Sequence, residues 1–441
     1  MIDVLEQGIV PDGKTLNTGA LQALIDRCGE AGGGTLSFPA GRYLTGGLEL
    51  RSHVHLHLEA GATLLGSTNL DDYTLYHPAP VRFYEDPDGV RALLFAHDVK
   101  HIRLSGAGTI DGQGPAIKRG KGVRASMPRN IWFAECEDVT VEGLHLRHSG
   151  FWMQHYLKCT RLRLRGLDVY NHGSCNNDGC DIDCCKDVVV SDCNIDSHDD
   201  ALCLKSGNLW PTENVVITNC ITRTHCNHFK TGTESNGGFR HITVSNLQMV
   251  PSTVLESDPN TGGADWRGAC GIALGCVDGG MMENISISHV QMDQVRVPFF
   301  IKLGDRGRLI HSGDKKLPVQ YARGIRISHV TARQASATGG YIMGLPEQPV
   351  QGVRIEHCDL EFEGGGDDAL AESVVPLKRE VYPSCDAFGN LPAYAIFMRD
   401  ATDVQLTNLT LRTMTPDARP ALRWQRVGKL SLQNVNEESS K

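Results

Sequence analysis

The sequence predicts an all-β fold, a right-handed parallel β-helix, because two series of short apolar strands repeat along it with one period. In the first series two apolar residues flank one other residue and are followed by Ser, Thr or Gly and then by Asn or His. The central steps are 23, 26, 27 and 27 residues. A period of about 25 residues without helices is typical of a solenoid built from strands. The members are Leu56–Leu58, Ile102–Leu104, Val139–Val141, Leu162–Leu164, Val188–Val190, Val215–Ile217, Ile242–Val244, Ile285–Ile287, Ile325–Ile327, Val353–Ile355, Val404–Leu406 and Leu430–Leu432.

The second series runs out of phase with the first. Each member is only about five residues long, which is too short for a helix, and each is bounded by turn-forming residues. Two short strands per period fit neither the Leu and Asn consensus of a leucine-rich repeat nor the longer period of a propeller. The members are Trp152–Tyr156, Cys180–Cys184, Ala201–Lys205, His228–Gly232, Gly271–Gly275, Phe299–Leu303, Tyr341–Leu345, Ala395–Arg399 and Ala421–Gln425.

A repeated unit can extend one core indefinitely, so the chain of 441 residues is expected to form one domain, residues 1–441. The segment Thr18–Gly29 has helical periodicity with Leu21, Leu24 and Ile25 on one face. We expect it to form a short helix that caps the end of the coil. Three segments interrupt the period and are expected to be loops on the coil: 251–267, 307–320 and 363–391.

Charge and composition exclude several classes of partner. The chain carries 43 Lys and Arg against 52 Asp and Glu, a net charge of −9, which argues against nucleic acid or an anionic membrane. No apolar run approaches the roughly 18–20 residues of a membrane span. The N-terminus lacks the features of a secretory signal, and the 15 cysteines show no zinc-type spacing. We expect a cytoplasmic protein without a metal or other cofactor; the mature form of a secreted protein would have the same N-terminus.

Two polar stretches, residues 176–183 and 196–200, form the most acidic part of the chain. Asp178 and Asp199 precede strands of successive periods by similar offsets. We therefore expect them at one corner of the coil and one rung apart, a spacing of about 4.8 Å. A close pair of carboxylates can supply both the proton donor and the base that glycosidic cleavage needs. The alternative is that these Asp and Asn side chains bond to the backbone of turns and cap strand ends.

These stretches resemble a known family. NNDGCD (residues 176–181) and DSHDDALCLKSG (residues 196–207) are similar to the NTDGxD and GDDxxxxKSG motifs of glycoside hydrolase family 28, the polygalacturonases and rhamnogalacturonan hydrolases. The opening of the chain (DGKT, an ALQ–ID helix, GGGT and PAGRYLTG) and GTIDGQG at residues 108–114 add to the resemblance. It implies an enzyme that inverts the anomeric configuration. By the same resemblance Asp199 is the general acid, and Asp178 and Asp200 position and deprotonate the attacking water.

The sequence departs from the family's pattern at two places. Asn227 stands where the family's Gly-His-Gly motif has its histidine, and the stretch Gly271–Leu274, which matches its Arg-x-Lys motif, holds Ala273 and no cation. Lys230 and Lys302 share an outward phase and are expected one rung on either side of Ala273, where they would replace the missing pair and bind an anionic sugar. The alternative is a solvated row of lysines.

Further substrate-binding candidates surround these positions. Arg306, in the loop after Lys302, would add positive charge, and Asn176 belongs to the first aspartate motif. Glu234 would contact a sugar hydroxyl, with a turn residue paired with a lysine as the alternative. His228 is expected to face outward and to replace the missing imidazole.

Three aromatic side chains near the aspartates complete the set. Trp152 would stack on a sugar face, with core packing as the alternative, and His155 lies on the same predicted strand. His198 would tune Asp199, with an exposed turn histidine as the alternative.

The leading hypothesis is an inverting, exo-acting glycoside hydrolase whose partner is a pectin-derived oligosaccharide of galacturonate or rhamnogalacturonan type. A β-helix polysaccharide lyase, with Ca²⁺ on the same carboxylates, is the first alternative. A non-catalytic carbohydrate-binding coil is the second, because a fold alone does not specify a function. The oligomeric state stays open.

Overall fold

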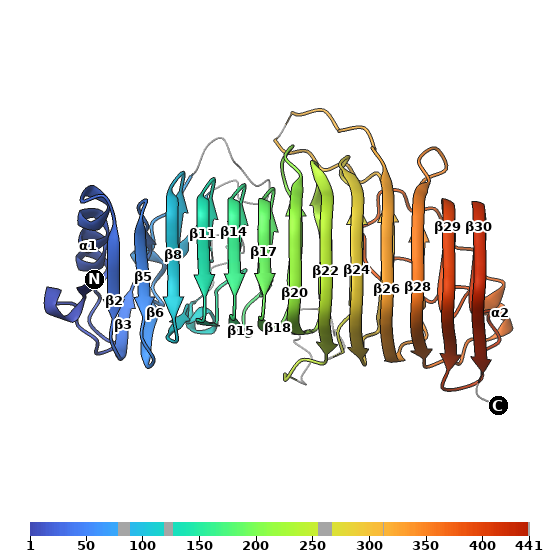
Figure 1. Ribbon diagram of the computed structural model, residues 1–441, viewed down its shortest axis with the longest axis horizontal. Helices are drawn as coiled ribbons and strands as arrows, with labels where there is room; N and C mark the ends of the chain where they lie inside the picture. Colours follow the sequence, from blue (N-terminus) through green and yellow to red (C-terminus); the bar gives the residue numbers. More distant parts are fainter. Residues whose placement is uncertain (78–88, 119–126, 255–266, 312, 440–441) are drawn as a thin grey trace. The chain divides into compact units, whose positions relative to one another are not determined.

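The computed structural model describes residues 1–77, 89–118, 127–254, 267–311 and 313–439. It divides into two compact units, Met1–Ala201 (the first unit) and Leu202–Lys441 (the second unit). Each is a stack of parallel strands wound as a β-helix (Figure 1), so the predicted fold class is confirmed. Over the described residues, no helix is both long and apolar enough to cross a membrane.

The first unit has three strands in each rung, not the two that the sequence predicted. Both predicted series are present, and a third follows the first after a sharp bend. Between the first-series and third-series strands stands a residue in the left-handed conformation, for example Gly143 at φ 74° and Gly166 at φ 60°, which glycine adopts without steric cost. The bend places Leu146 and Val169 inside, in register with each other. Because the third strands are only three to five residues long, their alternation was too brief to recognise in the sequence.

The strands of the first unit are grouped here by series. The first series is β2 (Gly34–Phe38), β5 (Val54–Leu58), β8 (Lys100–Gly106), β11 (Glu137–Glu142), β14 (Thr160–Arg165) and β17 (Lys186–Ser191). The second is β4 (Leu48–Glu49), β7 (Ala92–His97), β10 (Arg129–Ala134), β13 (Gln154–Leu157) and β16 (Cys180–Asp183). The third is β3 (Gly41–Thr45), β6 (Ala62–Gly66), β9 (Thr109–Asp111), β12 (His145–Arg147), β15 (Asp168–Asn171) and β18 (Asn194–Ser197). Outside the series lie β1 (Ile2–Asp3) and the 3₁₀ turns η1 (Leu5–Gln7), η2 (Leu70–Asp72) and η3 (Gly114–Ala116).

The predicted capping helix is present as α1 (Thr18–Glu30), one residue longer than expected. Its buried face consists of Leu21, Leu24, Ile25 and Cys28 and packs toward β2, β4 and β5. The Gln22 amide bonds to both the N–H and the C=O of Glu49, at 2.8 and 2.9 Å. The helix thus binds backbone groups at an end of the stack that would otherwise remain open.

In the second unit the first-series and third-series strands merge into long bent strands. The register pairs Val215 with Ile242, Ile242 with Ile285 and Ile285 with Ile325, which is the phase expected from the sequence. The long strands are β20 (Thr212–Thr224), β22 (Gly238–Val250), β24 (Met281–Asp293), β26 (Ala322–Ala335), β28 (Val350–Phe362), β29 (Ile396–Thr413) and β30 (Leu422–Ser439). The second series is β19 (Leu202–Ser206), β21 (Asn227–Ser235), β23 (Cys270–Cys276), β25 (Val297–Leu303) and β27 (Gly340–Met343), and it continues into β29 and β30.

The Asn or His of the sequence repeat lies at the bend of each long strand. His289, His329 and His357 have φ of 53–56°, and their rings stack at centroid distances of 4.8 and 5.0 Å. Asn and His enter this left-handed region more readily than most residues. The repeat therefore marks where each strand turns.

The predicted loops differ in structure. Most of 251–267 lies outside the described residues, and 307–320 contains neither strand nor helix in the part that the structure describes. The segment 363–391 (the insertion) contains the short helix α2 (Asp368–Ala371). It packs onto the second-series strands through one apolar cluster, to which Val375, Cys385, Phe388 and Leu391 belong.

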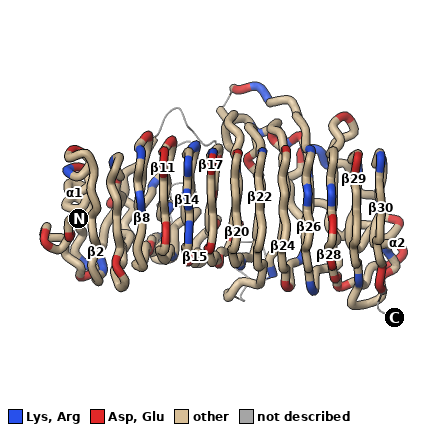
Figure 2. The backbone as a smooth tube through the Cα atoms, viewed as in Figure 1, with Lys and Arg blue, Asp and Glu red and all other residues tan. Residues whose placement is uncertain are grey.

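Basic residues (Lys, Arg) and acidic residues (Asp, Glu) both occur along the strands (Figure 2). On β14 Arg161 forms ion pairs with Glu137 and Asp138 of β11. Such exposed pairs are each worth about 0–1 kcal/mol. The stacked apolar interior therefore contributes most of the stability.

Candidate active site

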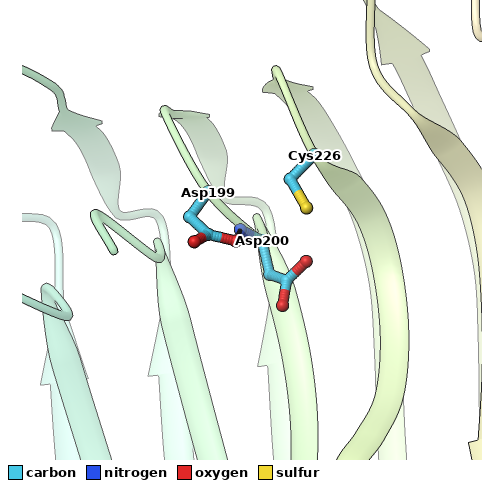
Figure 3. Close-up of side chains that lie close together, drawn as sticks. All are labelled: Asp199, Asp200 and Cys226. Carbon is cyan, nitrogen blue, oxygen red and sulfur yellow. Dashed lines mark hydrogen bonds between the residues drawn. The ribbon is translucent and has the colours of Figure 1, made fainter. Parts of the chain in front are cut away.

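The turn after β18 carries Asp199 and Asp200 (Figure 3). Asp199 Oδ1 accepts the N–H of Asp200 at 2.9 Å, and the Asp199 carbonyl accepts the Ser197 hydroxyl at 2.7 Å. Asp200 is buried, whereas Asp199 is partly exposed. The turn thus holds two adjacent carboxylates in different surroundings.

The segment before β16 carries Asp178. Asn171 donates to the Asp178 carbonyl at 2.8 Å, and this carbonyl also accepts the N–H of Met153 at 3.0 Å. Asn177 is fully buried and donates to the carbonyls of Ser149 and Phe151. These amide side chains anchor an irregular backbone, as turn-forming residues commonly do. The predicted alternative role of polar turn residues therefore applies to the asparagines.

Three hydrogen bonds join the two aspartate segments. Gly179 N–H donates to the Asp200 carbonyl at 2.8 Å, and Asp199 N–H donates to the Asn177 carbonyl at 3.3 Å. The Asn176 amide donates to Asp199 Oδ2 at 3.2 Å. A Cβ on Gly179 would come within 2.7 Å of the Ala201 carbonyl oxygen, so a side chain there would separate the segments. Asp178 and Asp199 therefore meet at one corner of the first unit, as the motif spacing predicted.

Histidines lie behind the aspartate turn. His172 Nε2 is 2.9 Å from Asp196 Oδ1, and the rings of His172 and His198 lie edge to face at 6.3 Å. His198 is buried, so the alternative of an exposed turn histidine is wrong. Its position directly before Asp199 is compatible with the tuning role suggested from the sequence.

Trp152 and His155 are both buried. Trp152 packs in an apolar cluster with Phe151, and the Arg129 guanidinium lies 5.0 Å from its ring centroid. His155 Nε2 is 3.4 Å from Asp183 Oδ2. The core-packing alternative for Trp152 is the one that its surroundings favour.

The predicted cations lie in the second unit. Lys230 Nζ is 3.1 Å from the Tyr382 hydroxyl and 5.5 Å from that ring's centroid. Glu234 is buried between Lys205, at 3.2 Å, and Arg308, at 2.7 Å. The predicted pairing of Glu234 with a lysine is confirmed, although Glu234 lies within β21 and not in a turn.

The pKa of Glu234 follows from this pairing. Burial alone would raise it, but the charges of Lys205, Lys230 and Arg306, with help from the backbone, outweigh burial and hold the pKa below its ordinary value. Glu234 is therefore an ionised partner of the surrounding cations.

Arg306 holds a second buried carboxylate. Its guanidinium makes a bidentate pair with Asp278, at 2.9 and 2.6 Å, and donates to the Thr233 carbonyl at 2.7 Å. Burial raises the pKa of Asp278 despite the opposing effect of Arg306. The Arg306 guanidinium also lies 5.7 Å from the centroid of the Tyr382 ring.

The predicted register of Lys302 is wrong. Phe300 stands opposite Ala273, and Lys302 stands opposite Gly275, two residues further along the strand. The Lys302 ammonium donates to the Lys378 carbonyl at 3.1 Å and faces Phe388 of the insertion at 5.0 Å. Burial under the insertion, with the nearby Arg399 and Lys378 charges, lowers its pKa to about 8. The offset arises because Ile301 and Leu303 fix only the inward phase, and the outward phase recurs every second residue.

His228 was expected to face outward, but the structure buries it. Its Nδ1 lies 2.9 Å from the Thr222 hydroxyl, and a Cβ on Gly268 would fall 2.3 Å from its Nε2. Thr222 is one of the inward residues of β20. The imidazole is therefore enclosed where the coil turns from β20 to β21.

Sequence reasoning missed Asp278 and Tyr382. Asp278 lies in a Gly-rich turn (Cys276–Gly280) that the sequence presents as an ordinary strand end, and Tyr382 lies in the insertion, which has no periodicity.

Comparisons with known proteins identify the family of the chain. The family model described as "Glycosyl hydrolases family 28" matches residues 28–375. A probable polygalacturonase of Vitis vinifera is 27% identical over 385 residues, which are 81% of this chain and 74% of the relative. An exo-poly-alpha-D-galacturonosidase of Dickeya chrysanthemi is 41% identical over 124 residues, 26% of this chain and 20% of the relative. The solved structure of a Yersinia enterocolitica family 28 exopolygalacturonase has the same fold, with a TM-score of 0.65 at 18% identity over 98% of this chain and 77% of that one.

Proposed function

The chain belongs to glycosyl hydrolase family 28, and we propose that it is an inverting, exo-acting enzyme that releases sugars from the ends of pectin-derived oligosaccharides. It is a polygalacturonase-like hydrolase with a pectin-type substrate. The family match favours hydrolysis over the lyase and the binding-only coil that the sequence left open.

The observation that carries the proposal is the meeting of the Asp178 segment with the Asp199–Asp200 turn. Asp199, the more exposed carboxyl, protonates the glycosidic oxygen, and Asp178 and Asp200 orient and deprotonate water. An inverting mechanism needs room for that water, which corresponds to about 6.5–9.5 Å between acid and base. Two carboxyls in unlike surroundings can divide the two roles.

Exo action is supported by the Dickeya relative and the Yersinia structure, which are named as exo-acting enzymes. The insertion supports it as well, because a segment packed over the outward face of the second unit restricts access to that face. Lys230 and Arg306 are proposed to bind an anionic sugar there. The remaining predicted contacts stay predictions: Trp152, His155, Asn176, His228, Glu234 and Lys302.

A location inside the cell is part of the proposal. It is supported by the cysteines, all of which are free thiols and most of which are buried; such usage suits a reducing compartment.

The direct test is a product profile on oligosaccharides that end in galacturonate, rhamnose or galactose, followed by NMR of the first product. We expect single sugars from one end, with the anomeric configuration opposite to that of the cleaved linkage. Net retention would mean that a carboxylate attacks the sugar directly, and the roles given to Asp178 and Asp200 would be wrong. Unsaturated uronides, or no products, would contradict a hydrolase.

A further inference from the structure

The insertion covers the place where the family's cationic motif would lie. Along the outward face of the second-series strands, Ala273, Phe300, Tyr341 and Phe397 follow one another in register. All four are buried in one apolar cluster with residues of the insertion. A sugar therefore has no access to the position of Ala273, and any contact to an anionic sugar must be made beside the cluster.

Tyr382, carried by the insertion, lies directly beside this covered face. Its hydroxyl is 3.1 Å from Lys230 Nζ, and its ring centroid is 5.5 Å from Lys230 Nζ and 5.7 Å from Arg306 Cζ. Lys230 is only 4% exposed, whereas Tyr382 is 50% exposed. The tyrosine therefore presents an open ring surface at the point where two cations converge from the coil.

The surrounding charges favour an anion. Lys205 and Arg308 pair with Glu234, Arg306 pairs with Asp278, and the charge of Lys230 helps to lower the pKa of Glu234. Four basic side chains thus gather around these two carboxylates, on a chain whose net charge is −9. In partly desolvated surroundings, such as those of Lys230, a cation attracts an anionic ligand more strongly than an exposed lysine does.

We propose that Tyr382, Lys230 and Arg306 form a subsite for a carboxylated sugar at the end of an oligosaccharide, and that Tyr382 is its specificity-determining residue. The apolar face of the sugar ring packs on the exposed tyrosine ring. The sugar carboxylate binds the Lys230 ammonium, which the Tyr382 hydroxyl holds in place, and Arg306, 5.7 Å from the centroid of the tyrosine ring, adds positive charge. The inference rests on the proposed function, since it names the class of sugar that this enzyme selects.

The test compares Tyr382→Phe with wild type on two oligosaccharides that differ only in their terminal sugar, galacturonate or galactose. Losing one hydroxyl contact to a charged group should raise KM for the galacturonate-ended substrate about three- to thirtyfold and leave kcat nearly unchanged. KM for the galactose-ended substrate should change less than twofold. Tyr321→Phe is the matched control, because it also removes one hydroxyl contact, the 2.7 Å bond to Glu283, without touching the subsite.

A second variant separates stacking from charge. Tyr382→Ala should weaken both substrates, and the galacturonate-ended one more, because it loses the ring surface and the lysine's partner together. If Tyr382→Phe affects both substrates equally, or neither, Tyr382 only fastens the insertion to the coil and the inference fails. Thermal unfolding shows whether a variant is less stable than the wild type. For a destabilised variant, binding of galacturonic acid to its folded fraction is measured as well.

Failure of the proposed function would look different. A wild-type protein that cleaves none of these oligosaccharides contradicts the hydrolase proposal and leaves the subsite open to direct measurement. NMR titration of the wild type with galacturonic acid and with galactose, which differ by the carboxylate, then decides it. Tighter binding of galacturonic acid that Tyr382→Phe abolishes supports the subsite, and equal binding of the two sugars overturns it.

Discussion

In the first unit main-chain hydrogen bonds link the aspartate turn to the neighbouring segment, whereas in the second unit the charged groups hold one another. Backbone hydrogen bonds link the Asp199–Asp200 turn to Asn177 and Gly179. Glu234 and Asp278 are instead fixed by ion pairs with Lys205, Arg306 and Arg308 at 2.6–3.2 Å. The first arrangement leaves carboxylates near a partly exposed corner, and the second buries most of its charge.

This difference has consequences for substitution. A side chain on a turn that is supported by its backbone can change without removing what holds the turn. A buried ion pair cannot lose one member without leaving the other uncompensated, which costs about 3–5 kcal/mol. The first unit should therefore show effects on catalysis with an intact fold, and the second should show effects on stability and binding.

The largest effect is expected from Asp199→Asn. The amide has the shape of the acid and preserves the turn, but it is far too weak an acid to protonate the glycosidic oxygen, so kcat should fall about a hundred- to ten-thousandfold. Steady-state kinetics would measure the loss of kcat, and thermal unfolding would measure whether the fold is intact. Asp187→Asn, on the exposed face of the same unit, is the control. A variant that keeps more than about a tenth of wild-type kcat would remove Asp199 from the acid role.

Glu234→Gln should mainly affect stability. Lys205 and Arg308 would lose their shared carboxylate, and the free energy of unfolding should fall by about 3–5 kcal/mol. Because the folded-state pKa of Glu234 is lowered, its stabilising effect is fully present above its ordinary pKa of 4.5 and is lost as pH falls through the folded value. Denaturant titrations from pH 3 to 7 should therefore show a flatter acid limb in the variant. Glu372→Gln, at a side chain 80% exposed, is the control, and equal effects of both variants would contradict the buried network.

Lys230→Met should act on binding. It keeps the apolar stem and removes the charge, and a charge-assisted contact is worth about 1.5–3 kcal/mol. KM for a uronate-ended substrate should rise about ten- to hundredfold while kcat changes little. The exposed Lys429, changed to Met, controls for net charge. An equal loss on a neutral-ended substrate would make Lys230 a structural residue.

The smallest effect is expected from Lys302 and concerns the pH dependence of the free energy of unfolding. Its folded-state pKa of about 8 lies below the ordinary 10.5, so the folded state disfavours its charged form. The unfolded chain binds the extra proton between these values, and the free energy of unfolding should rise with pH from about 8 to 10.5. Lys302→Met should remove that rise in denaturant titrations at pH 7.5 and 10.5. An unchanged pH dependence would mean that the insertion does not desolvate Lys302.

The fold could be predicted because its information is local. Each strand of the first two series was found from a few alternating apolar residues, and Val139, Leu162 and Val188 stack in the register that their spacing implies. The meeting of Asp178 and Asp199 followed from the same period. The third strand series was missed because its strands are short and continue the first series after a bend.

What remained hidden depends on segments without a period. The sequence could not show that the insertion returns to cover Ala273 and Phe300, because an irregular segment carries no register against a repeat. Tyr382 meets Lys230 across 152 residues of chain, and no local pattern marks such a pair. The alternation of inward and outward residues predicted that Lys302 faces outward. It did not determine which outward residue stands opposite Ala273, and the predicted register was wrong by two residues. The sequence by itself thus determined the coil and the aspartate corner, where neighbours in the repeat become neighbours in space. The tertiary structure alone decided which cations pair with carboxylates and which lie against the insertion, because burial and charge pairing there depend on how a distant segment folds back.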